Sequence, residues 1–383
     1  MTGQRLLRAV LAGGAVVLLA GCSFLNSLPF VGGAEKPKPA ELQADPKLLA
    51  VREAWTGKIG KVDFPLVVGV SGNVAAVAAS DGTVVGLDAT SGREQWRGSA
   101  GTGLAAGVGF DGSTAAVITR NNELVALVSG KEVWRQKLNA LSYTAPLVAG
   151  ARVFVLGGDR SVSAFDGGTG RRLWSQQRQG EPLVLRQAGV ILPVGDTLVV
   201  GQGGRLAGLN PLNGSVRWEV PIATARGIND IERLVDLVGR VSRVGDSLCV
   251  RAFQAAVGCV DAARGTVVWT QRANGAEGVH GDAANVFGTE SDGKVVSWRR
   301  SDGQRAWTND KLLHRGVGTP LALGRSVVVG DEFGFVHMLS REDGTLLTRL
   351  GTDGTAITAA PVAVGNTLIA VTQGGTIYGF VPQ

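Results

Sequence analysis

The sequence is poor in charged residues and in the side chains that build catalytic and metal sites. Asp, Glu, Lys and Arg make up 18% of the 383 residues, and there are three His, three Cys, two Met and two Tyr. Average chains carry about 25% charged residues. No H-E-x-x-H pattern and no Cys–His grouping at metal-ligand spacing occurs, which excludes the common zinc motifs. The shortage of Glu and Lys excludes a coiled coil or a long helical array.

Long apolar runs and long basic runs are also missing. The uninterrupted stretch of apolar residues and glycine at residues 9–20 is shorter than the roughly 20 residues that a membrane-spanning helix needs. Lys and Arg outnumber Asp and Glu by 38 to 32, a net charge of +6. The basic residues are scattered and are not interleaved with aromatic residues, so we expect no nucleic-acid partner.

The N-terminus has the pattern of a bacterial secretory signal. Arg5 and Arg8 precede the apolar stretch, and the segment Leu19-Ala20-Gly21-Cys22 resembles a lipobox. That resemblance implies cleavage after residue 21 and acylation of Cys22, with several acyl chains giving stable membrane attachment. An ordinary signal peptide with an unrelated cysteine is the alternative.

Three segments follow from this pattern. Residues 1–21 are predicted to be the lipoprotein signal peptide, residues 22–49 a lipidated flexible tether rich in Pro and Gly, and residues 50–383 the folded domain. Ser23, which follows the lipidated position in place of Asp, is similar to the residue that directs lipoproteins to the outer membrane.

One sequence phrase recurs through the folded part. Each copy has alternating apolar residues, then a Gly, and ends four residues later on a Trp. The copies end at Trp96, Trp134, Trp174, Trp218, Trp269, Trp307 and, with the Trp replaced, Thr348; their glycines are Gly92, Gly130, Gly170, Gly214, Gly265, Gly303 and Gly344. The phrase predicts a β-hairpin whose glycine permits a positive φ in the turn.

The spacing of the phrase predicts a β-propeller. Successive end positions lie 38 to 51 residues apart, the length of a four-stranded blade. The last copy stops before its second hairpin strand, whereas Trp55 has no hairpin ahead of it. We therefore predict an all-β fold, a single eight-bladed β-propeller of four-stranded antiparallel blades, whose ring is closed by the N-terminal strand. Seven blades are the alternative.

The few remaining candidates for chemistry give no catalytic or metal site. His280, His314 and His337 are isolated in the sequence, and we expect them on the surface of loops or strands. Cys249 and Cys259 lie on two strands of one predicted hairpin, either as a disulfide or as two reduced buried side chains. Trp298 falls outside the repeat phase, at a position where the other copies carry a core residue.

Two intervals between repeats are longer than a blade requires. One contains residues 183–186 and the other contains residues 223–241, where apolar and charged side chains are mixed. Apolar side chains amid charge are typical of a protein-binding edge. A long loop without a partner is the alternative.

The lipobox, the tether, the Trp-marked repeats and the segment INDIERLVD at 228–236 together resemble the BamB family. Members of that family are lipoprotein subunits of the outer-membrane β-barrel assembly (BAM) machine. The resemblance implies a scaffold without enzymatic activity or cofactor, anchored by lipid at the periplasmic face of the outer membrane. It implies that the chain binds the POTRA domains of BamA, contacts the other BAM lipoproteins through BamA, and assists the folding and insertion of unfolded β-barrel proteins.

The resemblance also assigns partner-binding residues in two loops. They are Leu183, Leu185 and Arg186 in the first loop, and Glu232, Arg233, Leu234 and Asp236 in the second. The family has a second acidic residue two positions after the first, where this chain has Val238.

The competing interpretation is a periplasmic PQQ-dependent dehydrogenase, since the repeat is similar to that of quinoproteins. The chain is short for such an enzyme. It lacks a vicinal Cys pair, a C-x-x-C-H haem motif and an identifiable acidic cluster for Ca²⁺.

Overall fold

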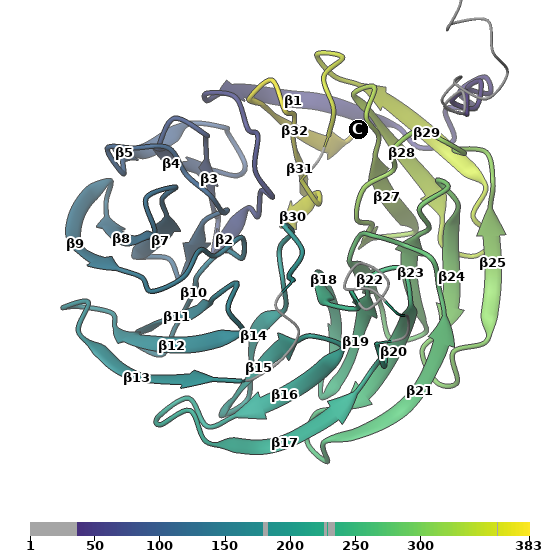
Figure 1. The fold of residues 1–383 in the computed structure, drawn as a ribbon. Coiled ribbons are helices and arrows are strands. Elements are labelled where there is room, and N and C mark those ends of the chain that lie inside the picture. Colours follow the sequence, from purple (N-terminus) through teal and green to yellow (C-terminus); the bar gives the residue numbers. More distant parts are fainter. Residues whose placement is uncertain (1–36, 179–182, 226–227, 229–233, 358) are drawn as a thin grey trace, which may run out of the picture. The chain divides into compact units, whose positions relative to one another are not determined.

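The computed structural model describes residues 37–383, apart from residues 179–182, 226–227, 229–233 and 358. Residues Ala40–Gln383 form one compact unit. Its 32 strands make eight four-stranded antiparallel sheets, which follow one another around a ring (Figure 1). The described residues include no helix long and apolar enough to cross a membrane.

The first four blades each consist of four strands that are consecutive in the chain. They are β2 (Gly69–Ser71), β3 (Val74–Ala78), β4 (Thr83–Asp88) and β5 (Glu94–Ser99); β6 (Gly109–Phe110), β7 (Thr114–Ile118), β8 (Glu123–Val128) and β9 (Lys131–Lys137); β10 (Leu147–Ala149), β11 (Arg152–Leu156), β12 (Ser161–Asp166) and β13 (Arg172–Gln177); and β14 (Ile191–Val194), β15 (Thr197–Gln202), β16 (Arg205–Leu209) and β17 (Val216–Pro221).

The next three blades repeat this order, and the eighth takes one strand from the other end of the chain. They are β18 (Leu237–Val244), β19 (Ser247–Ala252), β20 (Ala256–Asp261) and β21 (Thr266–Arg272); β22 (Val279–Gly281), β23 (Asn285–Thr289), β24 (Val295–Arg299) and β25 (Arg305–Asn309); β26 (Leu321–Leu323), β27 (Ser326–Gly330), β28 (Phe335–Ser340) and β29 (Leu346–Gly351); and β30 (Val362–Val364), β31 (Thr367–Val371) and β32 (Thr376–Pro382) with β1 (Val51–Lys58).

The second and third strands of each blade form the core. In β3 and β4 nearly every side chain is buried, whereas β5 at the outer edge alternates between exposed and half-buried residues. A strand that is covered on both faces by neighbouring blades loses the alternation of a sheet with one face in water. The continuous runs of Val, Ala and Leu in the sequence therefore become the walls between blades.

Residues from both ends of the chain close the ring. Strand β1 pairs antiparallel with β32, from Val51 opposite Pro382 to Lys58 opposite Thr376. Trp55 lies opposite Gly379 and is buried. The predicted eight-bladed ring with an N-terminal closing strand is confirmed, and the seven-bladed alternative is wrong.

Six of the repeated Trp residues cover the last turn of the next blade around the ring; Trp96 instead packs against Phe110 of the next blade, with ring centres 5.9 Å apart. The indole Nε1 of Trp55 donates a hydrogen bond to Ala89 O at 3.0 Å, in the last turn of the first blade. Gly92 in that turn has a φ of 70°, and a Cβ atom there would lie 2.4 Å from the Trp55 ring. The same contact joins Trp134 to Gly170, Trp174 to Gly214, Trp218 to Gly265, Trp269 to Gly303 and Trp307 to Gly344. The glycine is thus required by the turn and also by the indole that covers it.

The exception in the repeat, Thr348, has a structural cause. The Trp expected there would cover the last turn of the eighth blade, but this turn does not exist because β1 comes from the other end of the chain. Residues 43–48 lie against β29 in its place. Leu48 N donates to Leu347 O at 2.8 Å, and Arg349 Nη2 donates to Gln43 O at 2.7 Å.

A Trp at position 348 is therefore expected to destabilise the fold. Thr348 is buried beneath residues 43–48, with its hydroxyl 3.4 Å from a carboxylate oxygen of Asp45. Inserting an indole into this filled space costs about 1–3 kcal/mol. Chemical denaturation of Thr348→Trp should show this loss, with Thr348→Val as the control of similar volume. A variant as stable as the wild type would contradict the explanation.

The predicted signal peptide and tether are not tested by the structure. Residues 1–36, including Cys22, lie outside the described residues. Within the predicted tether, residues 40–49 contact the propeller, as the bonds of Leu48 and Gln43 show.

The structure corrects one expectation about histidine and agrees with another about tryptophan. His337 is fully buried in β28, where its Nε2 lies 3.0 Å from Asp331 Oδ2. It was expected on the surface, but both faces of this strand are covered by neighbouring blades. Burial lowers the pKa of His337, although Asp331 opposes the shift. Trp298 is 1% exposed and packs in the core, as predicted.

The two cysteines lie directly opposite one another. Cys249 of β19 pairs with Cys259 of β20, and the structure joins their sulfur atoms in a disulfide. Both side chains are fully buried beside Trp269.

Candidate partner-binding site

The two over-long intervals meet on one part of the ring. The first precedes β14 and the second precedes β18, which belong to adjacent blades. Gly189 and Val238 form an isolated antiparallel bridge, and Gly239 N donates to Ala188 O at 2.8 Å. Two segments separated by a whole blade in the sequence therefore lie side by side.

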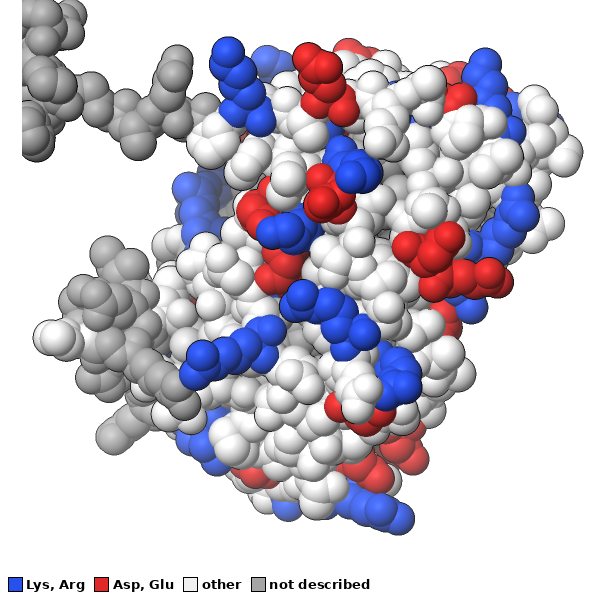
Figure 2. Space-filling view, turned by 90° about the vertical axis from the view of Figure 1, so that its right-hand side faces the viewer, with Lys and Arg blue, Asp and Glu red and all other residues white. Residues whose placement is uncertain are grey.

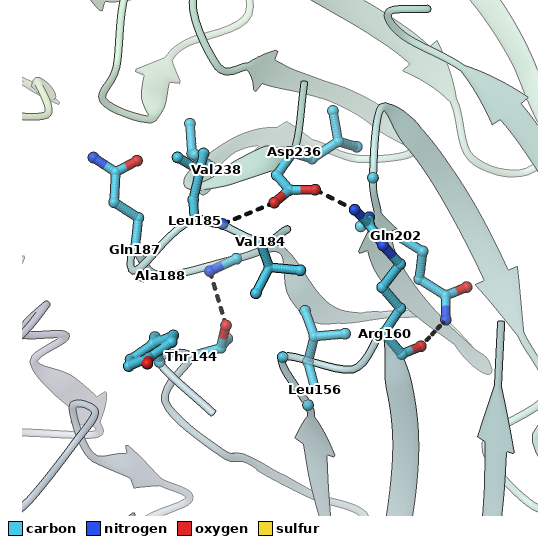
Figure 3. Close-up of a pocket in the computed structure, with 17 residues that line it drawn as sticks. Thr144, Leu156, Arg160, Val184, Leu185, Gln187, Ala188, Gln202, Asp236 and Val238 are labelled. Carbon is cyan, nitrogen blue, oxygen red and sulfur yellow. Dashed lines mark hydrogen bonds and ion pairs between the residues drawn. The ribbon is translucent and has the colours of Figure 1, made fainter. Parts of the chain in front are cut away.

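Asp236 connects these two segments to a third (Figure 3). One carboxylate oxygen lies 3.0 Å from Arg160 Nη1, and the other accepts a hydrogen bond from Leu185 N at 3.0 Å. Arg160 Nη2 donates to Leu183 O at 3.2 Å. Arg160 lies in the turn between β11 and β12 and has a φ of 63°. One ion pair thus fixes the backbone of residues 183–185.

Burial separates the residues that hold the site from those that face outward. The side chains of Arg160 and Asp236 are 10% and 14% exposed. Leu183 is 40% exposed and Arg186 is exposed, with its guanidinium carbon 5.8 Å from the centre of the Tyr143 ring. A guanidinium in this range of an aromatic face is attracted to it. Leu183 and Arg186 are therefore available to a partner, whereas Asp236 orients them.

Other hydrogen bonds stiffen the base of the site. Thr144 Oγ1 accepts from Gly189 N at 2.9 Å, and Gln202 Nε2 donates to Arg160 O at 2.8 Å. These residues line a small pocket with Leu156 and Val184 (Figure 3). None of the residues that line this pocket is a nucleophile hydrogen-bonded to a general base.

The predicted site residues are brought together only in part. Leu183, Leu185, Arg186, Leu234 and Asp236 lie in the two adjoining segments. Glu232 and Arg233 lie outside the described residues.

Sequence reasoning missed several residues of the site. Arg160 lies in the third blade and Tyr143 in the segment just before it. No spacing in the sequence links either residue to Asp236. Ile228 is 99% exposed and adds an apolar side chain to the second interval. Leu237 and Val238 belong to the interval 223–241, whose apolar side chains were expected at a binding edge. They are instead buried in β18.

Acidic and basic side chains are mixed on one side of the ring (Figure 2). Within the part of the chain that the structure describes, no three His, Cys, Asp or Glu residues are grouped to hold a metal ion. On the side of the ring near β21, β25 and β29, acidic and basic side chains are interspersed (Figure 2). Arg299 pairs with Asp302 at 2.7 Å there, and Lys311 pairs with Asp310 at 2.8 Å. Exposed pairs of this kind contribute little to stability and form no patch of one sign.

The comparisons with known proteins agree with this architecture. A family model described as outer membrane protein assembly factor BamB matches residues 80–309. The protein of that name from Burkholderia pseudomallei is 36% identical, over 99% of each chain. The crystal structure of BamB from Moraxella catarrhalis superposes with a TM-score of 0.79 at 25% identity, covering 86% of this chain and 99% of that one.

The quinoprotein enzymes share only the fold. Quinohemoprotein alcohol dehydrogenase from Comamonas testosteroni has a TM-score of 0.67 but 14% identity, covering 88% of this chain and 77% of that one. The match that spans nearly the whole sequence is to the assembly factors. By its sequence, its eight blades and the match of its repeats, the chain belongs to the family of the outer membrane protein assembly factor BamB.

Proposed function

We propose that this chain is a lipoprotein scaffold of the BAM complex and binds the POTRA domains of BamA. Through BamA it joins the other BAM lipoproteins, and it assists the folding and insertion of β-barrel outer-membrane proteins. It acts without catalysis or a cofactor. The supporting observation is the pair of adjoining loops in which the buried Arg160–Asp236 ion pair holds exposed Leu183 and Arg186.

The exposed residues have the chemistry of an interface centre. Arginine is enriched among the residues that dominate binding energies, and it pairs well with carboxylates. Leu183 and Ile228 supply apolar area beside it. Because the loop backbone is already held by Asp236 and Arg160, little conformational entropy is lost when a partner binds. We therefore assign the partner contact to Leu183 and Arg186, and a positioning role to Asp236.

The N-terminal pattern supports a location at the periplasmic face of the outer membrane. In this proposal the acyl chains on Cys22 hold the protein on the membrane, where the POTRA domains are reached. The residues between Cys22 and Ala40 then serve as the connection to the propeller.

The positioning role predicts a specific result for Asp236→Asn. Asn keeps the shape of the side chain but removes the charge that pairs with Arg160, and it accepts hydrogen bonds less strongly. Affinity for the purified POTRA domains should fall about tenfold, which corresponds to about 1.4 kcal/mol. At the same time the amide hydrogen of Leu185, which Asp236 accepts, should exchange faster with solvent.

The two readouts separate positioning from direct contact. A loss of affinity with unchanged exchange at Leu185 would show that Asp236 touches the partner itself. Unchanged affinity and unchanged exchange would remove Asp236 from the site. Asp261→Asn is the matched control, because Asp261 lies at the end of β20 and forms its ion pair with the exposed Arg264, at 3.6 Å.

A further inference from the structure

The ring encloses a cavity whose wall shares only Arg186 with the residues of the proposed partner contact. Its volume is about 660 Å³, and all eight blades line it, chiefly with residues in or just before their innermost strands. Clefts of about 300–1,000 Å³ are typical of sites for small ligands. The cavity is therefore large enough for a compact organic molecule.

Most of the cavity wall is apolar. Phe64, Leu66 and Phe110 come from the first two blades, and Leu192 and Val241 come from the fourth and fifth. Phe64 and Leu66 are buried in the hydrophobic core that joins the first blade to the eighth. An apolar wall of this kind favours a ligand with a hydrocarbon or aromatic body.

Three of the four ionisable residues that line the cavity already have a partner within the protein. Asp63 Oδ1 pairs with Arg120 Nη2 at 2.6 Å, and the hydrogen bonds from Ser80 and Arg120 lower the pKa of Asp63. Arg186 lies over Tyr143 at the rim. Glu277 accepts a hydrogen bond from Thr319 Oγ1 at 3.1 Å, and burial raises its pKa.

Arg240 is the exception, because it is a cation within the ring without an acidic partner. Its Nη1 donates to Pro361 O at 2.8 Å, and no carboxylate in the described part of the chain lies within ion-pair distance of it. Burial lowers the pKa of Arg240 to about 10, so the guanidinium stays charged at neutral pH. Its charge helps burial to lower the pKa of His280 to about 3.

A second buried arginine shows how the fold satisfies such a charge elsewhere. Arg251 is fully buried, lies 3.4 Å from Glu290 and stands over the Trp298 ring. A buried charge is costly unless a counter-charge accompanies it. Arg251 has that counter-charge within the protein, whereas Arg240 faces the cavity.

We propose that the central cavity binds a small amphipathic carboxylate, with the carboxylate on Arg240 and the apolar body against Phe64, Leu66 and Leu192. The guanidinium presents its N–H groups in a planar fork that matches both oxygens of a carboxylate. The ligand supplies the missing counter-charge and at the same time covers apolar wall. This site shares Arg186 with the proposed POTRA contact but takes its counter-charge at Arg240, so either assignment can fail without the other.

The test compares a carboxylate with its neutral analogue. Titration calorimetry of the full mature chain with octanoate and with octanamide should show octanoate binding at least tenfold more tightly. In Arg240→Gln the preference should disappear, while Arg240→Lys should keep most of it. Arg264→Gln is the control, because the Arg264 side chain is 80% exposed at the end of the fifth blade. Equal binding of the two probes, or octanoate binding unchanged in Arg240→Gln, overturns the proposal.

A second variant covers the case in which Arg240→Gln does not fold. Ala276→Trp places an indole in the cavity beside Glu277 and leaves Arg240 in place. It should abolish octanoate binding while it keeps the far-ultraviolet circular dichroism and the cooperative melting that Arg264→Gln shows. Octanoate binding that survives in a folded Ala276→Trp chain places the ligand outside the cavity and overturns the proposal.

Discussion

Deleting residues 1–58 is expected to abolish the cooperative fold, whereas deleting residues 1–39 leaves it intact. The longer deletion removes β1 and leaves β32 as an unpaired edge at the point where the ring closes. It also removes Trp55, which covers Gly92 and bonds to Ala89 O. Loss of one buried Trp side chain costs about 3–5 kcal/mol by itself, and an open sheet edge promotes aggregation.

Thermal unfolding of the two truncated chains checks this expectation. The chain that begins at residue 40 keeps every strand and should melt in one transition. The chain that begins at residue 59 should be aggregated or should show no transition. In the chain that begins at residue 40, Trp55→Ala measures the contribution of the indole alone. It should lower the melting temperature by roughly 4–7 °C, given the unfolding entropy of a chain of this size. A stable ring without residues 1–58 would show that closure by β1 is dispensable.

The double variant Leu183→Ala/Arg186→Glu is expected to lose at least a hundredfold in affinity for the POTRA domains of BamA. Both side chains are exposed, and neither is part of the ion pair that shapes the loop. The change removes apolar area and reverses a charge at the centre of the proposed contact. Two such residues account for about 2 kcal/mol or more each when they dominate an interface. Calorimetry with the isolated POTRA domains measures the change.

The control must reverse a charge elsewhere on the ring. Arg264→Glu does so at a side chain that is 80% exposed, in the final turn of the fifth blade. It should bind the POTRA domains as the wild type does, and both variants should keep the wild-type melting temperature. Full affinity in the double variant would move the interface away from residues 183–186.

The repeat allowed the fold to be predicted from the sequence more completely than the site. A Trp and a Gly four residues apart mark a hairpin wherever they occur, so counting them counts blades. The unmatched Trp55 and the truncated last copy then required β1 to pair with β32. What the repeat did not reveal is why Gly92 and its equivalents recur so strictly. Except at Gly130, the second reason is the indole of the preceding blade, a contact between residues 34 to 47 apart that no local pattern encodes.

The site depended on contacts between distant parts of the chain. The long intervals indicated residues 183–186 and 234–236, because residues in excess of a four-stranded blade must form loops outside the sheet. The sequence did not show which of these residues hold the loop and which face a partner, because Asp236 pairs with Arg160, 76 residues away in the sequence. Arg240 meets Pro361 across 121 residues, and nothing near either residue indicates a cavity between them. His337 was misplaced for the same reason, because its burial is produced by the blades on either side of β28.

Site-specific photo-crosslinking in the outer membrane tests the central claim most directly. A photoreactive residue at position 183, and separately at position 228, is compared with one at Val268, which is 53% exposed on β21. The proposed function predicts crosslinks to the POTRA domains of BamA from positions 183 and 228 and none from position 268. Crosslinks from position 268 alone, or none from positions 183 and 228 while the complex stays assembled, would contradict it.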